Sequence, residues 1–189
     1  MIAGIDSQIL VYAGLVPKKS GRAPLSEDDK RLSFRATILL NNLKDETVVL
    51  PMLAVAELLV PVALSKRGSL ITALSEMFSC PDFDEKAAAI AAEIWAKYKT
   101  VPADQRYENR HVMRVDALIV ASAKSAGATD FYTNDDNCRA LANLVMKGRE
   151  LPTHSEELFI KEMIESGMVE LPAKRRAARK KKAKRKKKP

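Results

Sequence analysis

Cysteine, histidine and aromatic residues are all scarce in this chain of 189 residues. The two cysteines, Cys80 and Cys138, and the two histidines, His111 and His154, lack the spacing of a disulfide framework or a zinc knuckle. Such sparse cysteine usage is typical of proteins from a reducing compartment. We therefore expect an intracellular, cytoplasmic protein.

Long apolar runs are also missing. The longest, from Val48 to Leu64, has 17 residues and is interrupted by Pro51, Glu57 and Pro61. A membrane-spanning helix needs about 20 predominantly apolar residues. The first ten residues also lack the basic start of a signal peptide. We predict neither a membrane span nor a secretory leader.

Acidic residues are absent from the last part of the chain, residues 174–189, which holds 12 Lys and Arg. The rest of the chain is mildly acidic, with 20 basic and 24 acidic residues. A run such as Lys180, Lys181 and Lys182 cannot bury a core but suits contact with a polyphosphate. We predict a disordered polybasic tail over 171–189 that binds RNA; the alternative is a solubilising extension.

Short apolar segments alternate with longer amphipathic ones, which predicts an α/β fold with a parallel sheet covered on both faces. The predicted strands are residues 2–5, 47–50, 131–133, 150–152 and a short edge strand at 80–83. The predicted helices are residues 8–13, 26–44, 52–60, 69–78, 84–98, 116–126, 138–146 and 155–165. Residues 14–29, with two Pro and two Gly, predict a mobile loop.

Local sequence signals support several of the predicted helix ends. Ser26 and Asp29 have the spacing of a capping box, Asp84 suits an N-cap, and Gly127 suits the end of a helix. Trp95 and Tyr98 share one helical face, which predicts core packing or a dimer face.

Four acidic positions attract attention because Asp6 and Asp135 follow predicted strands, where ligands bind in open α/β sheets. Taken singly, each acid has a structural explanation: Asp6 and Asp116 as helix N-caps, and Asp135 and Asp136 as an Asx turn. Glu57 lies in a run of Val, Leu and Ala, either at an exposed helix rim or in a site.

Taken together, the acids predict a metal site. No Lys or Arg lies within five residues of Asp6 or within eight of Glu57 to pair with them locally. Clustered carboxylates repel one another, and a hard divalent ion such as Mg²⁺ or Mn²⁺ relieves that repulsion. Such an ion also activates water for attack on a phosphodiester.

Four motifs resemble those of the PIN-domain nucleases, and particularly of the VapC-type toxins of bacterial toxin and antitoxin pairs. They are Ile5-Asp6-Ser7, Ala56-Glu57-Leu58, the segment from Asp116 to Ala123, and Thr133-Asn134-Asp135. Their order and spacing agree with the family over about residues 1–160. The Asp116 and Thr133 segments are the most specific.

The resemblance implies a three-layer α/β/α fold over residues 1–170, with about five strands, and a metal-dependent endoribonuclease. In that scheme Asp6, Glu57, Asp116 and Asp135 hold Mg²⁺ or Mn²⁺, and Ser7 and Thr133 support the site. The expected products are a 5′-phosphate and a 3′-hydroxyl. The expected partners are RNA, a small antitoxin and a second copy of the chain in a homodimer.

Some features depart from the family or leave its functions open. Many relatives carry an acid and an aromatic where this chain has Asn137 and Cys138, and Asp136 is an extra carboxylate, so either Asp135 or Asp136 is the fourth ligand. His111 and Arg114 precede Asp116 and are candidate phosphate contacts, or else surface residues. A housekeeping or phage-associated nuclease, a DNA nuclease and a catalytically silent RNA-binding module are the alternatives.

Overall fold

A computed structural model describes residues 1–16, 26–102 and 110–153. The chain divides into two compact units, Met1–Pro152 and Thr153–Pro189. The first contains all the helices and strands described below. The predicted helix at 155–165, His154 and the polybasic tail lie outside the described residues, so these predictions and the proposed domain boundary at residue 170 stay predictions.

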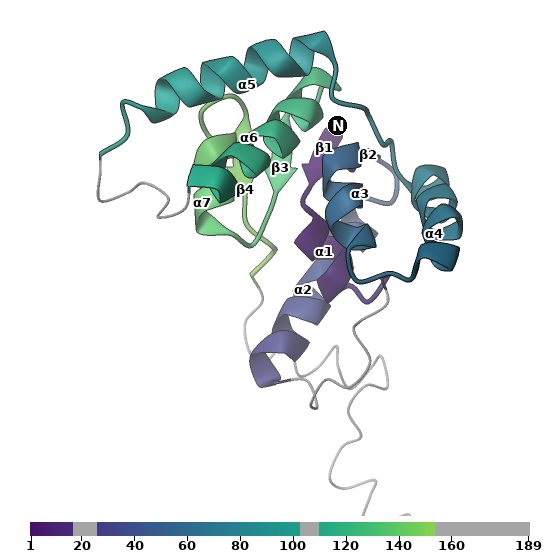
Figure 1. The fold of residues 1–189 in the computed structure, drawn as a ribbon. Coiled ribbons are helices and arrows are strands. Elements are labelled where there is room, and N and C mark those ends of the chain that lie inside the picture. The colour runs from purple at the N-terminus through teal and green to yellow at the C-terminus, as the bar shows by residue number, and fades with distance from the viewer. Residues whose placement is uncertain (17–25, 103–109, 154–189) are drawn as a thin grey trace, which may run out of the picture. The chain divides into compact units, whose positions relative to one another are not determined.

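A parallel sheet forms the centre of the first unit, with strands in the order β2-β1-β3-β4 (Figure 1). The strands are β1 (Ile2–Ile5), β2 (Thr47–Val49), β3 (Asp130–Tyr132) and β4 (Lys147–Arg149). Strand β1 is an inner strand, its residues are small or aliphatic, and all but the first, Ile2, are buried. Parallel strands buried on both faces have this composition.

The sheet has four strands among the described residues, not about five. The predicted edge strand at 80–83 is reduced to a single parallel bridge between Val49 and Ser79. Backbone hydrogen bonds from Leu50 to Ser79 (2.8 Å) and from Ser79 to Val48 (2.9 Å) continue the sheet there. Pro81, which has no N–H to donate, limits further pairing.

Helices surround the sheet, and their ends are where local side-chain chemistry favours them. The helices are α1 (Ser7–Tyr12), α2 (Glu27–Asn42), α3 (Met52–Leu59), α4 (Leu64–Met77), α5 (Glu85–Tyr98), α6 (Arg110–Ser125) and α7 (Asp136–Ala142). The capping box of Ser26 and Asp29 is present, and Asp84 caps α5. Gly127 follows the end of α6 and has a φ of 91°, in the left-handed conformation that glycine tolerates.

Several predicted boundaries are wrong. Helix α2 begins at Glu27, so residues 27–29 belong to a helix and not to the predicted 14–29 loop. Helix α6 begins at Arg110, six residues before Asp116, and buried Met113 anchors that extra length. Asp116 therefore lies inside the helix and is not its N-cap.

The C-terminal elements are also shifted towards the N-terminus. Helix α7 covers Asp136–Ala142 and strand β4 covers Lys147–Arg149, where a helix to Met146 and a strand at 150–152 were predicted. The predicted helix at 138–146 implied that Gly148 closes it, but Gly148 lies in β4. A Cβ at that position would come within 2.5 Å of the Arg139 backbone oxygen, so its lack of a side chain permits α7 to pack against β4.

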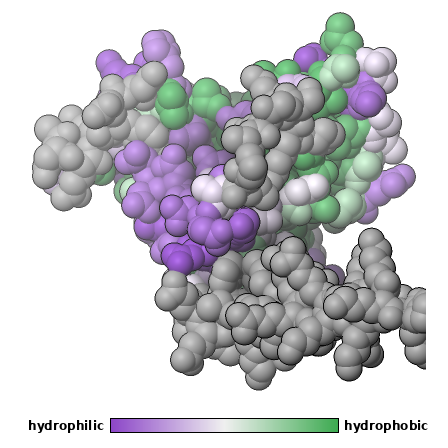
Figure 2. Space-filling model, turned by 90° about the horizontal axis from the view of Figure 1, so that it is seen from below, coloured by the Kyte–Doolittle hydropathy of each residue, from purple (hydrophilic) through white to green (hydrophobic). Residues whose placement is uncertain are grey.

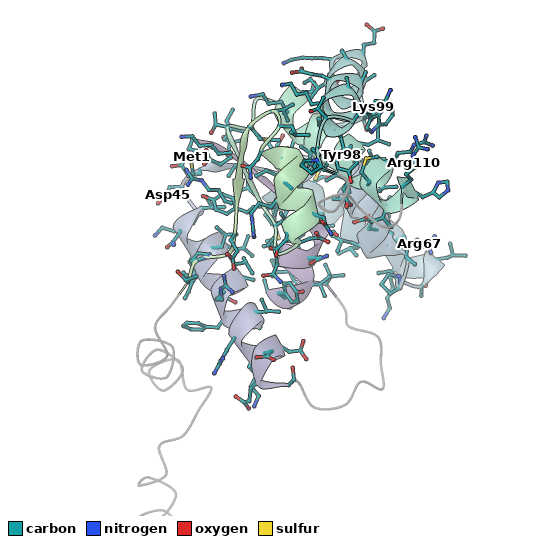
Figure 3. The ribbon with its side chains drawn as sticks, turned by 90° about the vertical axis from the view of Figure 1, so that its left-hand side faces the viewer. Met1, Asp45, Arg67, Tyr98, Lys99 and Arg110 are labelled. Carbon is teal, nitrogen blue, oxygen red and sulfur yellow. The ribbon has the colours of Figure 1, made fainter. Side chains whose placement is uncertain are left out.

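The sheet is the middle layer of an α/β/α arrangement. Helix α6 packs on one face, where Ala123 and Phe131 approach Gly4 so closely that a Cβ on Gly4 would lie 2.9 and 2.7 Å from them. Helix α2 lies on the other side of the sheet (Figures 1 and 3). Helix α5 covers α6 through buried Ala91 and Ile94, with Trp95 and Tyr98 half-buried against the core.

None of the described helices is long and apolar enough to cross a membrane. Cys80 and Cys138 are both free thiols.

Candidate functional site

Strand register brings the first and last acidic motifs together. Strands β1 and β3 are neighbours, with Ile5 opposite Tyr132, so Asp6 and Thr133 leave the sheet at the same edge. The backbone N–H of Asp6 donates to the Tyr132 carbonyl at 3.1 Å, which extends the pairing by one residue. The Thr133 hydroxyl then donates to Asp6 Oδ2 at 2.8 Å. Both side chains are buried.

Asp6 occupies the N-cap position of α1, but its carboxylate makes no capping hydrogen bond with that helix. Its partners are hydroxyl groups: Thr133 on Oδ2 and Ser7 on Oδ1, at 2.8 and 3.2 Å. The helix-cap explanation for Asp6 is therefore wrong in its hydrogen bonding. The carboxylate is held at the sheet edge by the first residue of α1 and by the residue that follows β3.

Ser7 joins Asp6 to Glu57. Its hydroxyl lies 2.8 Å from Glu57 Oε2 and 3.2 Å from Asp6 Oδ1, so the two carboxylates are within two hydrogen-bond lengths of each other. A serine hydroxyl has a single proton to donate. It cannot satisfy both carboxylates fully at once. Glu57 reaches this position because α3 packs against α1, although part of its side chain stays open to water.

Burial and mutual repulsion change the acidity of this pair. Removal of water raises the pKa of Asp6, against the hydrogen bonds from Thr133 and Ser7 that lower it. Partial loss of water and the charge of Asp6 raise the pKa of Glu57, against the hydrogen bond from Ser7. The pair therefore resists carrying two negative charges at once, and a nearby cation would relieve that cost.

Asp116 and Asp135 lie near enough to the thiol of Cys138 for their charges, like that of Asp6, to act on it. Burial, followed by the negative charges of Asp6, Asp116 and Asp135, raises the pKa of Cys138 well above its usual range. Asp116 is half-buried on α6, which packs against both α3 and α7. Cys138 was not among the predicted site residues; its only sequence signal was its position three residues after Asp135 on a helix.

Asp135 and Asp136 have different partners. Asp135 caps α7, and its Oδ1 accepts from the backbone N–H groups of Asn137 (2.7 Å) and Cys138 (3.1 Å). Its own N–H donates to the Thr133 hydroxyl at 3.1 Å. Asp136 is exposed and pairs with Arg139 at 2.6 Å. The Asx-turn explanation thus accounts for one oxygen of Asp135, while Asp136 is neutralised by a surface arginine.

The predicted phosphate contacts are exposed on α6. His111 and Arg114 precede Asp116 by five and two residues, which places them about 140° and 200° around the helix from it. They lie on a different face of α6 from Asp116. Lys180, Lys181 and Lys182 lie outside the described residues.

The face at the carboxyl ends of the strands is divided by hydropathy. Figure 2 views it from below and shows hydrophilic residues gathered on one half and hydrophobic residues on the half under α3 and α4. The exposed Val60 and Leu64, from the α3–α4 junction, belong to the apolar set.

The donor set suits a hard cation in kind. All the acids offer oxygen, the ligand that Mg²⁺ and Mn²⁺ prefer. The pKa values of Asp6 and Glu57 are raised, and a nearby cation would lower them again. Within the part of the chain that the structure describes, no three acidic, His or Cys side chains are already arranged around one point. The fit therefore rests on the Asp6–Glu57 pair with Asp116 and Asp135 nearby.

Comparison with known proteins agrees with this geometry. Residues 23–144 match the PIN domain, a range that includes Glu57, Asp116 and Asp135 but begins after Asp6. No curated protein matches the chain.

Among solved structures, the fold is similar to the crystal structure of VapBC2 from Rickettsia felis bound to a DNA fragment from their promoter. The TM-score is 0.53 and the sequence identity 17%, over 80% of this chain and 100% of that one. At this identity the likeness concerns the fold. Since the PIN match covers well over half of the sequence, the chain belongs to the PIN domain family.

Proposed function

We propose that this protein is a metal-dependent endoribonuclease whose site is formed by Asp6, Glu57, Asp116 and Asp135. The observation that carries the proposal is the shared Ser7 hydroxyl, which holds the carboxylates of Asp6 and Glu57 side by side. Loss of water raises the pKa of both carboxylates, the charge of Asp6 adds to this at Glu57, and a bound cation would offset both effects. Membership of the PIN family supports a nuclease.

Each side chain has a distinct part in this mechanism. When bound, Mg²⁺ or Mn²⁺ would supply charge neutralisation at the scissile phosphate and a more acidic water. Asp6, clamped by Thr133 and Ser7, would be the fixed ligand, and partly open Glu57 would hold the attacking water. Asp135 retains Oδ2 for a ligand, whereas Asp136 is engaged by Arg139. We therefore propose Asp135 over Asp136 as the fourth acid.

The test is cleavage of RNA and DNA by the purified full-length protein with Mn²⁺. We expect RNA cleavage that is abolished by EDTA and by Asp6→Asn, and reduced little by Asp136→Asn. Cleavage that survives EDTA would refute the metal site. Preferential cleavage of DNA would favour a structure-specific DNA nuclease, and RNA binding without cleavage would favour a silent binding module.

We propose further that the protein is the toxin of a toxin–antitoxin pair. The fold likeness to the VapBC2 complex supports a small protein partner. Expression of the active protein in bacteria should arrest growth, and Asp6→Asn should remove that arrest. Growth that is unaffected by the active nuclease would favour a housekeeping role. A homodimer and a cytoplasmic location belong to the same proposal.

The polybasic tail is proposed as an RNA-binding appendage. If it neutralises about four phosphates, the slope of log affinity against log salt should change by about 2.8 when residues 174–189 are deleted. The requirement for metal should stay unchanged. An unaltered salt slope would refute a role of the tail in RNA binding.

A further inference from the structure

The α3–α4 junction carries an arginine that is held by a backbone carbonyl and, among the described residues, pairs with no carboxylate. Arg67, in the first turn of α4, donates from Nε to the Val62 carbonyl at 3.1 Å. Three other arginines held by hydrogen bonds, Arg35, Arg139 and Arg149, each pair with an acid. Among the described residues, Arg67 has no such acid. Within the described part of the chain, its two Nη groups have no hydrogen-bond partner.

This arginine is tied to the acidic site through a compact turn. The N–H of Val60 donates to the Glu57 carbonyl at 3.2 Å, and that of Val62 donates to the Leu59 carbonyl at 3.0 Å. Arg67 then binds Val62. Successive short-range hydrogen bonds thus hold the backbone between Glu57 and the first turn of α4.

The sequence around Arg67 carries only positive charges. Residues 58–75 contain Lys66 and Arg67 but no acid. Helix α4 begins after Ala63, which offers no side chain to cap the first N–H groups, so the positive end of the helix dipole is open. Lys66 is exposed, and no described carboxylate pairs with it. These contributions all favour an anion at the same place.

A second cation lies on the same side of the molecule. Figure 3 shows Arg67 and Arg110 on one side and Met1 and Asp45 on the opposite side. Arg110 begins α6, the helix that carries Asp116 and packs against α3. Cations therefore flank the α3–α6 pair, whose helices carry Glu57 and Asp116.

We propose that Arg67, with Lys66, binds a backbone phosphate of the RNA strand next to the scissile bond. The inference rests on the proposed ribonuclease function. A guanidinium whose Nε is already engaged presents its two Nη groups as a pre-formed fork, the geometry that suits phosphate oxygens. Acidic residues alone repel RNA, so a fixed cation beside them is needed to seat the strand.

The experiment combines protein variants with neutralised phosphates, using the full-length protein and Mn²⁺. The cleavage position is first mapped on a single-stranded RNA. Short RNAs are then made in which one phosphate at a time, on either side of that position, is replaced by an uncharged methylphosphonate. Values of kcat and KM are measured for the wild type, Arg67→Ala and Lys66→Ala. Lys44→Ala, beside Asp45 on the opposite side, is the matched control.

Arg67→Ala should lower kcat/KM about tenfold, chiefly through KM, because an exposed charge-assisted hydrogen bond is lost. The loss should vanish for the one RNA that already lacks the contacted phosphate. Lys66→Ala should show a smaller loss at the same phosphate, and Lys44→Ala should match the wild type. Since Lys66→Ala removes no hydrogen bond of the junction, it tests the same contact without disturbing the turn.

The proposal is overturned if Arg67→Ala and Lys66→Ala behave as Lys44→Ala does, or if their losses are equal on every RNA. A surface at Val60 and Leu64 that serves a protein partner would give the first result. Failure of the ribonuclease proposal looks different. In that case the wild type itself does not cleave RNA, or cleavage persists in Asp6→Asn.

Discussion

The Ser7 hydroxyl lies 2.8 Å from Glu57 Oε2, although the two residues are 50 positions apart in the sequence. This contact connects the start of α1 with α3 and places a proton donor between two candidate metal ligands. It also determines how the site responds to pH, because the same hydroxyl lowers the pKa of both Asp6 and Glu57.

Ser7→Ala should shift the acid limb of the pH profile of kcat/KM to higher pH. Without the hydroxyl, burial and repulsion act on Asp6 and Glu57 unopposed by Ser7, so both carboxylates protonate at a higher pH. Initial rates from pH 5 to pH 8 at fixed Mn²⁺ provide the measurement. Ser7→Thr, which keeps the hydroxyl, is the control. An acid limb that does not move would mean that Ser7 has no electrostatic role.

Asp6→Asn should leave the metal-free protein as stable as the wild type or more stable at neutral pH. The folded-state pKa of Asp6 is raised, so protonation favours the folded state and stability falls as pH rises from the unfolded value through the folded one. Above that window the ionised carboxylate lowers the stability of the folded state, which the neutral Asn avoids. Urea denaturation in EDTA at pH 4 and pH 7.5 tests this.

Mn²⁺ should reverse the order of stability of the wild type and Asp6→Asn. A ligand that binds only the folded state stabilises it by about 2.7 kcal/mol at one hundred times its Kd. The wild type should gain this stability and Asp6→Asn should gain little. Equal gains in both proteins would place the metal elsewhere.

Gly4→Ala should destabilise the fold by about 1–3 kcal/mol through overpacking. The new Cβ would lie 2.7 Å from Phe131 Cδ2 and 2.9 Å from the Ala123 methyl, both in the core. Combining it with Phe131→Leu should recover part of the loss relative to the sum of the two single changes. Urea midpoints at constant m-value give the loss of stability of each single variant and of the double variant. Strictly additive losses would argue against this clash.

Arg149→Ala should destabilise the protein by about 1–2 kcal/mol at pH 7, a figure discounted because half of the Arg149 side chain is exposed. It leaves Asp130, which is buried, without its 2.7 Å partner. Burial tends to raise the pKa of Asp130, but hydrogen bonds from Arg149 and Thr129 bring it below its usual value.

The stability that the Arg149–Asp130 ion pair contributes has a predictable pH dependence. Because the folded-state pKa of Asp130 is lowered, its contribution is fully present above the unfolded value and is lost as pH falls through the folded one. The gap between wild type and Arg149→Ala should therefore narrow in acid. A gap of constant size between pH 7 and pH 3 would show that Arg149 acts through packing alone.

Much of the fold could be predicted because its signals are local. The capping box at Ser26 and Asp29, the cap at Asp84 and the glycine at Gly127 lie where each local rule places them. Boundaries failed where a tertiary contact decided them. Gly148 is in a strand and not after a helix, because α7 packs too closely on β4 for any side chain there.

For the site, the residue types were evident from the sequence and their partners were not. Spacing could nominate Asp6, Glu57, Asp116 and Asp135, but Asp6 and Asp116 were equally compatible with helix caps. Asp116 proved to lie within α6, and Asp6 to accept from the hydroxyls of Ser7 and Thr133 without a side-chain capping hydrogen bond. The arginine that engages Asp136 was visible as an i, i+3 pair, yet its effect on the choice between Asp135 and Asp136 required the coordinates.

The sequence by itself determined the alternation of strands and helices and the scarcity of charges that could neutralise the acids locally, because both depend on neighbours along the chain. Only the tertiary structure decided that Ser7 lies between Asp6 and Glu57, that Thr133 clamps Asp6, and that Arg67 pairs with no acid in the part of the chain that the structure describes. The register of parallel strands and the packing of α3 on α1 set those contacts, and both join residues far apart in sequence.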